Sequence, residues 1–216
     1  MLANFSVIHY NSTIAQRAYE EVFKDFYEYR IIPITHSAIK DHRMKKKFAD
    51  DCLRIRYLGP QAGVKGYTIL KQALDMLWKD RQNFCLDIHF EPIERSPYMR
   101  VHNRYNYSEL GDIFRETDVL VAPSIWYETF GYTVLEALSY GVPVIISDTV
   151  GAKDILADGA GIVINGISAE KLFKEIKLIT PKKLLEMNSE ICKKQHIMEI
   201  AEMEQRMENE CYQKCL

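Results

Sequence analysis

The chain has 216 residues and a net charge of −2, with 47% hydrophobic and 27% charged residues. This size suits one large or two small domains of a soluble globular protein. Three consecutive lysines at 45–47 are not repeated as a basic stripe, so no nucleic-acid partner is expected. No apolar run approaches the ~20 residues that cross a bilayer.

The start of the sequence lacks the basic segment, apolar segment and cleavage site of a secretory signal. The five cysteines are scattered and odd in number, which fits a reducing compartment. We therefore expect a cytoplasmic protein, either free in solution or lying peripherally on the inner face of the membrane.

Strand-like and helix-like segments alternate along the chain. Short apolar segments predict strands at 5–9, 29–34, 53–58, 84–89, 119–122, 144–147 and 161–164. Amphipathic patterns predict helices at 12–24, 66–80, 108–116, 131–140, 168–179, 183–194 and 197–214. The alternation predicts an α/β fold of the Rossmann type, with a doubly wound, mostly parallel sheet and helices on both faces.

A polar, basic segment at 35–50 interrupts this pattern and predicts a soft boundary. Residues 1–35 are too few to bury a core alone. We expect them to be an appendage of the sheet or the remnant of a larger neighbouring domain.

A glycine-rich turn, G-P-Q-A-G-V-K-G over residues 59–66, follows the third predicted strand. Its spacing fits neither a nucleoside-triphosphate loop nor a dinucleotide fingerprint. Lys65 stands at the mouth of the next helix, where a lysine can either reach a phosphate or simply be solvated. Both interpretations stay open at this point.

The most informative stretch is P-S-I-W-Y-E-T-F-G-Y-T-V-L-E-A-L-S-Y-G-V-P-V-I-I-S over residues 123–147. A strand runs into a turn and a glycine then opens a helix, which presents backbone N–H groups to an anion. Glu128 lies among bulky neighbours just before this helix, where a carboxylate would repel a phosphate unless it accepts hydrogen bonds from hydroxyls, such as a sugar diol.

Glu136 lies on the same helix, opposite the apolar side formed by residues 134, 135, 137 and 138. The pattern predicts that Glu136 avoids the core, and leaves open whether it is solvated or binds a ligand. A second glycine turn, at 151–161, follows another strand and either flanks the same site or is an ordinary connection. The histidines are isolated, and no Ser/His/Asp arrangement follows from their spacing.

With these residues in view, the chain resembles the carboxyl-terminal half of a retaining glycosyltransferase of the large family four, built on the two-Rossmann-domain B-type fold. The specific match is the E-x7-E pattern formed by Glu128 and Glu136 within residues 123–147. Three other segments match less specifically. Gly59-x5-Lys65-Gly66 resembles the turn that binds the donor phosphate, and residues 151–161 resemble the final loop. Residues 102–105 and 108–110 resemble the segment on the side of the nucleotide base (the base-side segment).

The resemblance implies a nucleotide-sugar as donor substrate, with no metal or other cofactor. Glu128 and Lys65 would be the catalytic residues, because Glu128 would hold donor-sugar hydroxyls and Lys65 would neutralise the leaving diphosphate. Glu136 would bind the ribose diol. The other donor-binding positions that it implies are Gly59, Arg104, Tyr105, Thr129, Phe130, Gly131, Tyr132 and Thr133.

Two positions depart from the family pattern. Pro60 stands where the family usually has an arginine, which removes a bidentate phosphate ligand and predicts weaker donor affinity or slower turnover. Asp154 stands where the late loop usually has a glutamate.

The resemblance also implies a domain organisation and a function. Residues 1–35 resemble the last strand–helix–strand element of an amino-terminal acceptor domain, 36–196 the donor-binding domain, and 197–216 the helix that crosses back. The expected function is retaining sugar transfer from a nucleotide-sugar to a glycan or lipid-linked acceptor, with the acceptor domain supplied by a separate chain or a second copy. The alternatives are a truncated or non-catalytic nucleotide-sugar-binding module and, less favoured, half of a sugar-nucleotide epimerase.

Overall fold

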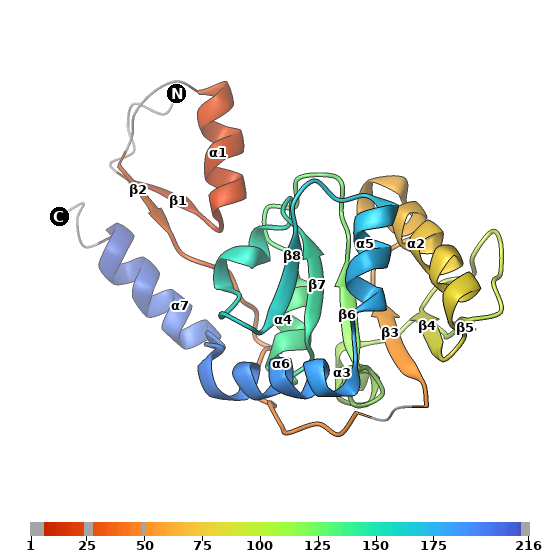
Figure 1. Ribbon diagram of the computed structural model, residues 1–216. Helices are drawn as coiled ribbons and strands as arrows, with labels where there is room; N and C mark the ends of the chain where they lie inside the picture. Colours follow the sequence, from red (N-terminus) through yellow and green to blue (C-terminus); the bar gives the residue numbers. More distant parts are fainter. Residues whose placement is uncertain (1–6, 24–27, 49–50, 213–216) are drawn as a thin grey trace.

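The structure, a computed structural model, describes residues 7–23, 28–48 and 51–212. Its main body is a six-stranded parallel sheet in the order β5-β4-β3-β6-β7-β8 (Figure 1). The strands are β3 (Leu53–Tyr57), β4 (Phe84–Ile88), β5 (Met99–Val101), β6 (Val119–Ala122), β7 (Val144–Ser147) and β8 (Gly161–Ile164). The chain runs outward from β3 to β5 and then returns to place β6 beside β3, so the winding direction reverses between β3 and β6.

Helices cover both faces of the sheet. On one face α2 (Tyr67–Asp80) and α5 (Ala169–Lys177) pack on each other and on a core that includes Ile55 and Val121. The other face carries α3 (Leu110–Arg115), α4 (Tyr132–Ser139) and α6 (Pro181–Lys194), with Leu120 and Ile146 among the strand residues buried beneath them. Neighbouring strand residues point to opposite faces, and both faces are buried, as parallel sheets require. This architecture confirms the predicted fold class.

A smaller unit precedes the sheet and lies to its side in Figure 1. It contains β1 (Ile8–Tyr10), α1 (Thr13–Val22) and β2 (Tyr29–Ile31), and the two strands pair in parallel. Ser12 caps α1 by accepting a hydrogen bond from the Ala15 amide, and its hydroxyl donates to the Thr129 carbonyl at 2.5 Å. The amide and hydroxyl of Thr13 both donate to the Asp154 carboxylate. The unit is therefore bonded directly to the loops that follow β6 and β7.

We expect Ser12→Ala to lower the free energy of unfolding by about 2 kcal/mol, because it removes both a helix cap and a long-range hydrogen bond. Urea denaturation followed by circular dichroism measures this loss. Thr180→Ala is the matched control, because Thr180 caps α6 through the Lys183 amide but is exposed. Equal losses in the two variants would show that the bond to Thr129 contributes nothing.

Several helices and strands begin or end at residues other than those predicted. The strand predicted over 29–34 ends at Ile31, two residues before Pro33, which has no amide donor for a ladder. The strand predicted over 5–9 is found at Ile8–Tyr10, and residues 5 and 6 lie outside the described ranges. A 3₁₀ turn, Tyr107–Glu109, precedes α3. Strand β5 was not predicted, because it has only three residues, fewer than an alternating pattern needs to be recognised.

The carboxyl-terminal helix is shorter than the predicted range 197–214. Helix α7 covers Ile200–Met207 and continues as a π turn over Glu208–Tyr212, and residues 213 and 214 are not described. In the parts of the chain that the structure describes, no helix is long and apolar enough to cross a membrane.

Candidate functional site

A cavity of about 180 Å³ opens at the carboxyl ends of β3 and β6, where the winding of the sheet reverses. Ligands of open α/β sheets bind at this kind of position, because the loops on either side of the reversal separate there. The residues that line the cavity are Tyr57, Leu58, Gly59, Pro60, Lys65, Leu120, Val121, Ala122, Glu128, Gly131, Tyr132, Thr133 and Val134. Six of the predicted site residues are therefore brought together: Gly59, Lys65, Glu128, Gly131, Tyr132 and Thr133.

The glycine-rich turn after β3 is held against the loop after β6. The amides of Ile125 and Trp126 both donate to the Val64 carbonyl, at 3.0 and 3.2 Å, and the Ser124 hydroxyl donates to the same oxygen at 3.0 Å. Gly66 has φ +77° and ends the turn just before α2. These bonds fix the backbone of Lys65 at the rim of the cavity.

Lys65 and Glu128 face each other across this cavity. The Lys65 ammonium lies 3.0 Å from a Glu128 carboxylate oxygen, with the two side chains 40% and 19% exposed. Each group is accessible to a ligand, and each neutralises the other. A ligand with an anionic group and hydroxyl groups could bind Lys65 through the anion and Glu128 through the hydroxyls at the same time.

The backbone of Glu128 is tied to the loop that follows β7. Its amide donates to the Thr149 carbonyl, and its carbonyl accepts from the Gly151 amide. Gly131, with φ +106°, then opens α4. The first amides of a helix have no partner within the helix and carry its positive dipole end, so this turn presents N–H groups to an anion at the cavity.

Of the two alternatives left open for Glu136, the structure rules out the solvated one. Glu136 does point away from the apolar side of α4, but its exposed fraction is only 3%. Burial raises the pKa of its carboxyl to about 7. His36, in the segment that follows β2, lies over it, with the Nε2 atom 3.5 Å from a Glu136 oxygen. The solvated alternative is wrong, because a segment far away in the sequence covers this side of the helix.

Tyr105 is the part of the base-side segment that lies near Glu136. Burial is the main cause that raises the pKa of Tyr105 to about 12, and the Glu136 charge is the second, so the phenol stays neutral. The Tyr105 ring packs on His89, with ring centroids 4.7 Å apart. The base-side segment and α4 therefore approach each other around Tyr105 and Glu136.

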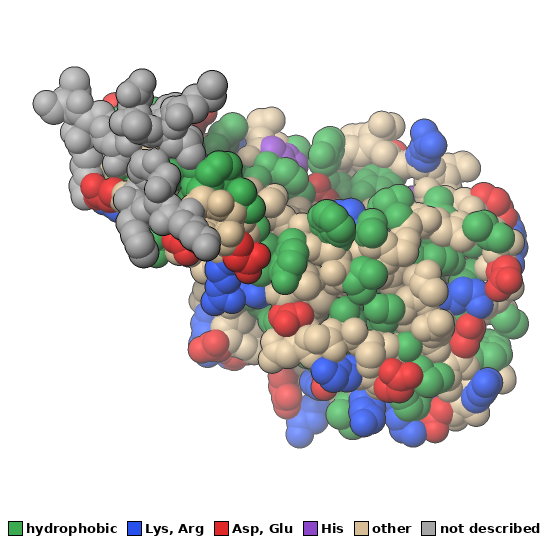
Figure 2. Space-filling model, turned by 90° about the horizontal axis from the view of Figure 1, so that it is seen from above, with side chains coloured by type: hydrophobic (Ala, Val, Ile, Leu, Met, Phe, Trp, Pro, Cys, Tyr) green, Lys and Arg blue, Asp and Glu red, His purple; other side chains and the backbone are tan. Residues whose placement is uncertain are grey.

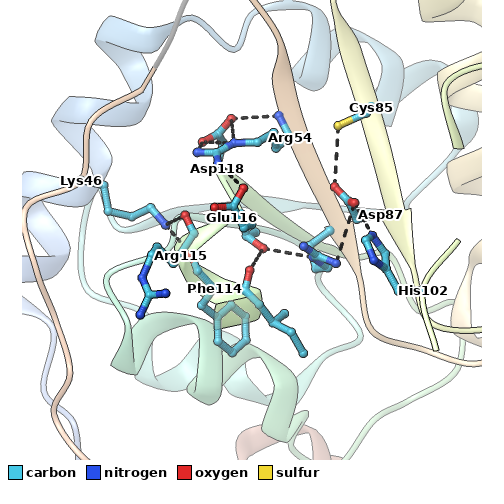
Figure 3. A network of polar contacts seen from close by, with 12 residues as sticks. Lys46, Arg54, Cys85, Asp87, His102, Phe114, Arg115, Glu116 and Asp118 are labelled. Carbon is cyan, nitrogen blue, oxygen red and sulfur yellow. Dashed lines mark hydrogen bonds and ion pairs between the residues drawn. The ribbon is translucent and has the colours of Figure 1, made fainter. Parts of the chain in front are cut away.

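A buried polar network holds the base-side segment in place (Figure 3). The Asp87 carboxylate contacts His102 Nε2 at 2.5 Å and lies 4.0 Å from the buried Arg56 guanidinium. Arg56 also donates to Thr117, and its second nitrogen lies 3.2 Å from His89 Nε2. Because Arg56 can only donate, His89 Nε2 is the acceptor and its Nδ1–H donates to the Asn103 carbonyl at 2.7 Å. Strands β3 and β4 thus fix residues 102 and 103.

The remaining predicted residues lie outside the cavity. The Phe130 side chain is buried and lines a separate cavity of about 250 Å³ with Pro33 and Ile34. The Thr129 carbonyl is taken by Ser12, and Arg104 is exposed at the surface. Asp154 binds Thr13 of the amino-terminal unit.

A larger cavity, of about 670 Å³, lies at the other edge of the sheet, beside residues 41–47 and the ends of α3 and α4. There Lys46 donates to the Phe114 carbonyl, and burial lowers its pKa to about 8. Arg43 is held by Asp41 and by the carbonyls of Ile191 and Gln195 at the end of α6. Lys46 and Arg43 thus hold loops and helix ends together. The larger size of this cavity does not make it the functional site.

Three residues near the site are absent from the predicted set, namely His36, His89 and Tyr107. His36 lies between the rings of Tyr107 and Tyr132, with centroids 5.2 Å from each. Nothing in the sequence marks these positions, because His36 lies in an aperiodic segment and each contact joins residues that are far apart along the chain.

The chain is similar to known glycosyltransferases in part of its sequence and in its fold. Residues 96–195 match the family model described as glycosyl transferases group 1. An uncharacterised 41.2 kDa protein in the cps region of Klebsiella pneumoniae is 31% identical over 126 residues, which cover 56% of this chain and 35% of that protein. The chain thus spans about a third of the length of this curated relative.

Two solved structures show the same fold. HepE of Anabaena, in complex with UDP and glucose, matches with a TM-score of 0.75 and 14% identity over 95% of this chain and 62% of its own. Sucrose-phosphate synthase of Thermosynechococcus elongatus matches with a TM-score of 0.73 and 17% identity over 99% of this chain and 59% of its own. Residues 96–195 thus match the group 1 glycosyl transferase model, and the chain has the fold of part of these two solved structures.

Proposed function

We propose that the chain is the donor-binding domain of a retaining hexosyltransferase, which transfers a sugar from a nucleotide-sugar to a glycan or lipid-linked acceptor. The observation that carries this proposal is the Lys65–Glu128 ion pair at the switch point of the sheet. The diphosphate of a donor would replace Glu128 as the partner of Lys65, and the sugar hydroxyls would replace Lys65 as the partners of Glu128. One ligand would thus satisfy both charges.

In the proposed reaction, the bond between the sugar and the diphosphate breaks as the acceptor hydroxyl bonds to the same sugar carbon; negative charge grows on the leaving phosphate, which takes up the acceptor proton. Lys65 and the amide groups at the start of α4 would stabilise that charge, and they act more strongly in the transition state than in the ground state. Glu128 would hold the sugar hydroxyls and orient the reacting carbon. Glu136 would accept hydrogen bonds from the ribose diol.

Figure 2 shows a face of the molecule on which hydrophobic side chains lie among charged ones. Beside the cavity, Trp126 is 66% exposed and Tyr127 64%, and Ile125 and Val64 are also exposed. Contiguous exposed apolar side chains mark interaction surfaces. We propose that a separate acceptor-domain chain or a second copy of this chain covers this patch and positions the acceptor.

Calorimetric titration with UDP, GDP, ADP and UDP-glucose tests the donor site. UDP and UDP-glucose are the first probes because the HepE structures hold UDP and UDP-glucose. We expect at least one of these ligands to bind, and Lys65→Ala to weaken its binding about tenfold to hundredfold, since a hydrogen bond to a charged phosphate is lost. Lys45→Ala, at the other edge of the sheet, should bind like the wild type.

The outcomes separate the candidate functions. Absence of binding by all four ligands, or equal affinities of the Lys65 and Lys45 variants, would refute the donor site. Binding with slow donor hydrolysis supports a transferase that depends on a partner. Binding without turnover supports a non-catalytic module, and formation of an epimeric nucleotide-sugar supports the epimerase alternative.

A further inference from the structure

His36 is placed over the buried carboxylate of Glu136 by a segment with its own anchors. The segment follows β2, and the Ile39 amide donates to the His36 carbonyl in a tight turn. Ile39 itself is buried in the core beside α4. The position of the His36 ring is therefore set by the fold.

The contacts of His36 define its protonation state. The Ala38 amide donates to His36 Nδ1 at 3.3 Å, so Nδ1 is an acceptor and the ring proton is on Nε2. Burial lowers the pKa of His36, which favours the neutral ring. The flanking rings of Tyr107 and Tyr132 limit its rotation. His36 thus points one N–H donor toward Glu136.

This donor has no hydrogen-bond partner. Among the described residues, His36 Nε2 is one of five buried side-chain polar atoms without one, and the hydroxyl of the neighbouring Thr35 is another. The Glu136 oxygen lies 3.5 Å from it but forms no hydrogen bond with it. A buried donor without a partner destabilises the folded protein, and a ligand that accepts from it would remove this cost.

A hydroxyl group is the ligand that suits both side chains. Its oxygen accepts from the His36 N–H while its own hydrogen is donated to the Glu136 carboxylate. We propose that His36 is a specificity-determining residue of the donor site, which works with Glu136 to distinguish a ribose from a deoxyribose. This inference rests on the proposed function, because it requires a nucleotide at the cavity.

The test compares ribonucleotides with deoxyribonucleotides in calorimetric titrations of the 216-residue chain. The first step identifies which of UDP, GDP and ADP binds the wild type most tightly. The second step measures that nucleotide and its 2′-deoxy and 3′-deoxy analogues on His36→Phe, which keeps a ring between Tyr107 and Tyr132 and removes the N–H donor.

We expect His36→Phe to weaken binding of the ribonucleotide about tenfold, and to leave the affinity of one of the two deoxy analogues unchanged. His36→Gln, which restores an N–H donor, should recover part of the affinity. His42→Phe is the matched control, because His42 also packs on a tyrosine, Tyr140 at 4.8 Å, but lies beside the other cavity. It should bind like the wild type.

A wild-type chain that binds none of the three nucleotides refutes the proposed function together with this inference, before any variant is made. If the wild type binds and His36→Phe binds the ribonucleotide equally well, only the inference is overturned. The same holds if His36→Phe weakens the ribonucleotide and both analogues equally. Should His36→Phe not fold, the Nε2 nitrogen shift of His36 is measured in the wild type, and an unchanged shift on nucleotide binding overturns the inference.

Discussion

Gly66→Ala is expected to destabilise the domain by about 4 kcal/mol or more, the largest effect of any single substitution proposed for this chain. Gly66 has φ +77°, a conformation that costs a residue with a β carbon about 1–2 kcal/mol. In addition, a β carbon at this position would lie 1.8 Å from the Pro123 carbonyl oxygen, which is backbone and cannot move aside. The turn that carries Lys65 would have to separate from the loop after β6.

Gly63→Ala is the matched control for this prediction. Gly63 belongs to the same turn, does not have a positive φ, and has no atom within 4 Å of the added carbon. Its free energy of unfolding should stay within about 1 kcal/mol of the wild type. Urea denaturation followed by circular dichroism compares the two variants, and similar midpoints for both would show that the contact of Gly66 with Pro123 is not required.

Glu136→Gln is expected to change the pH dependence of stability by about 3 kcal/mol. The ordinary pKa of this carboxyl is 4.5 and burial raises it to about 7. Between these values the folded protein keeps a proton that the unfolded chain has released, so the wild type loses stability as the pH rises. A shift of this size corresponds to about 3 kcal/mol, all present below pH 4.5 and lost by about pH 7.

Glutamine has the same shape and no such titration, so the Glu136→Gln variant should gain stability relative to the wild type as the pH is raised from 4.5 to 8. Denaturation midpoints at several pH values measure the difference. Glu186→Gln, on the exposed side of α6, is the control and should follow the wild type. A constant difference between the Glu136 variant and the wild type would show that the Glu136 carboxyl has an ordinary pKa in the folded protein.

Much of the fold was predictable because apolar strand segments and helical periodicity are both patterns among neighbouring residues. The apolar strands at 119–122 and 144–147 and the glycine that opens α4 were predicted at the residues where the structure has them. The periodicity of α4 also placed Glu136 opposite the apolar side. It could not predict burial, because the covering residue, His36, comes from a segment with no periodicity of its own.

The candidate site shows the same limit. The sequence placed Lys65 and Glu128 each just before a helix, in the turn that follows a strand, and the order of the strands brings these two turns together. Their ion pair could not be predicted, because it depends on β6 returning to the side of β3 after two outer strands. The network of Arg56, Asp87 and His102 was likewise hidden, because its members come from three separate strands or loops.

The bonds made by Ser12 and Thr13 give the molecule a mechanical property. They join the start of the first helix to the Thr129 carbonyl in the loop after β6 and to the Asp154 carboxylate in the loop after β7. A rotation of the amino-terminal unit about the sheet would therefore pull on the backbone between Glu128 and Gly131. A partner that binds the β1–β2 strand pair would therefore transmit force to the backbone beside Glu128.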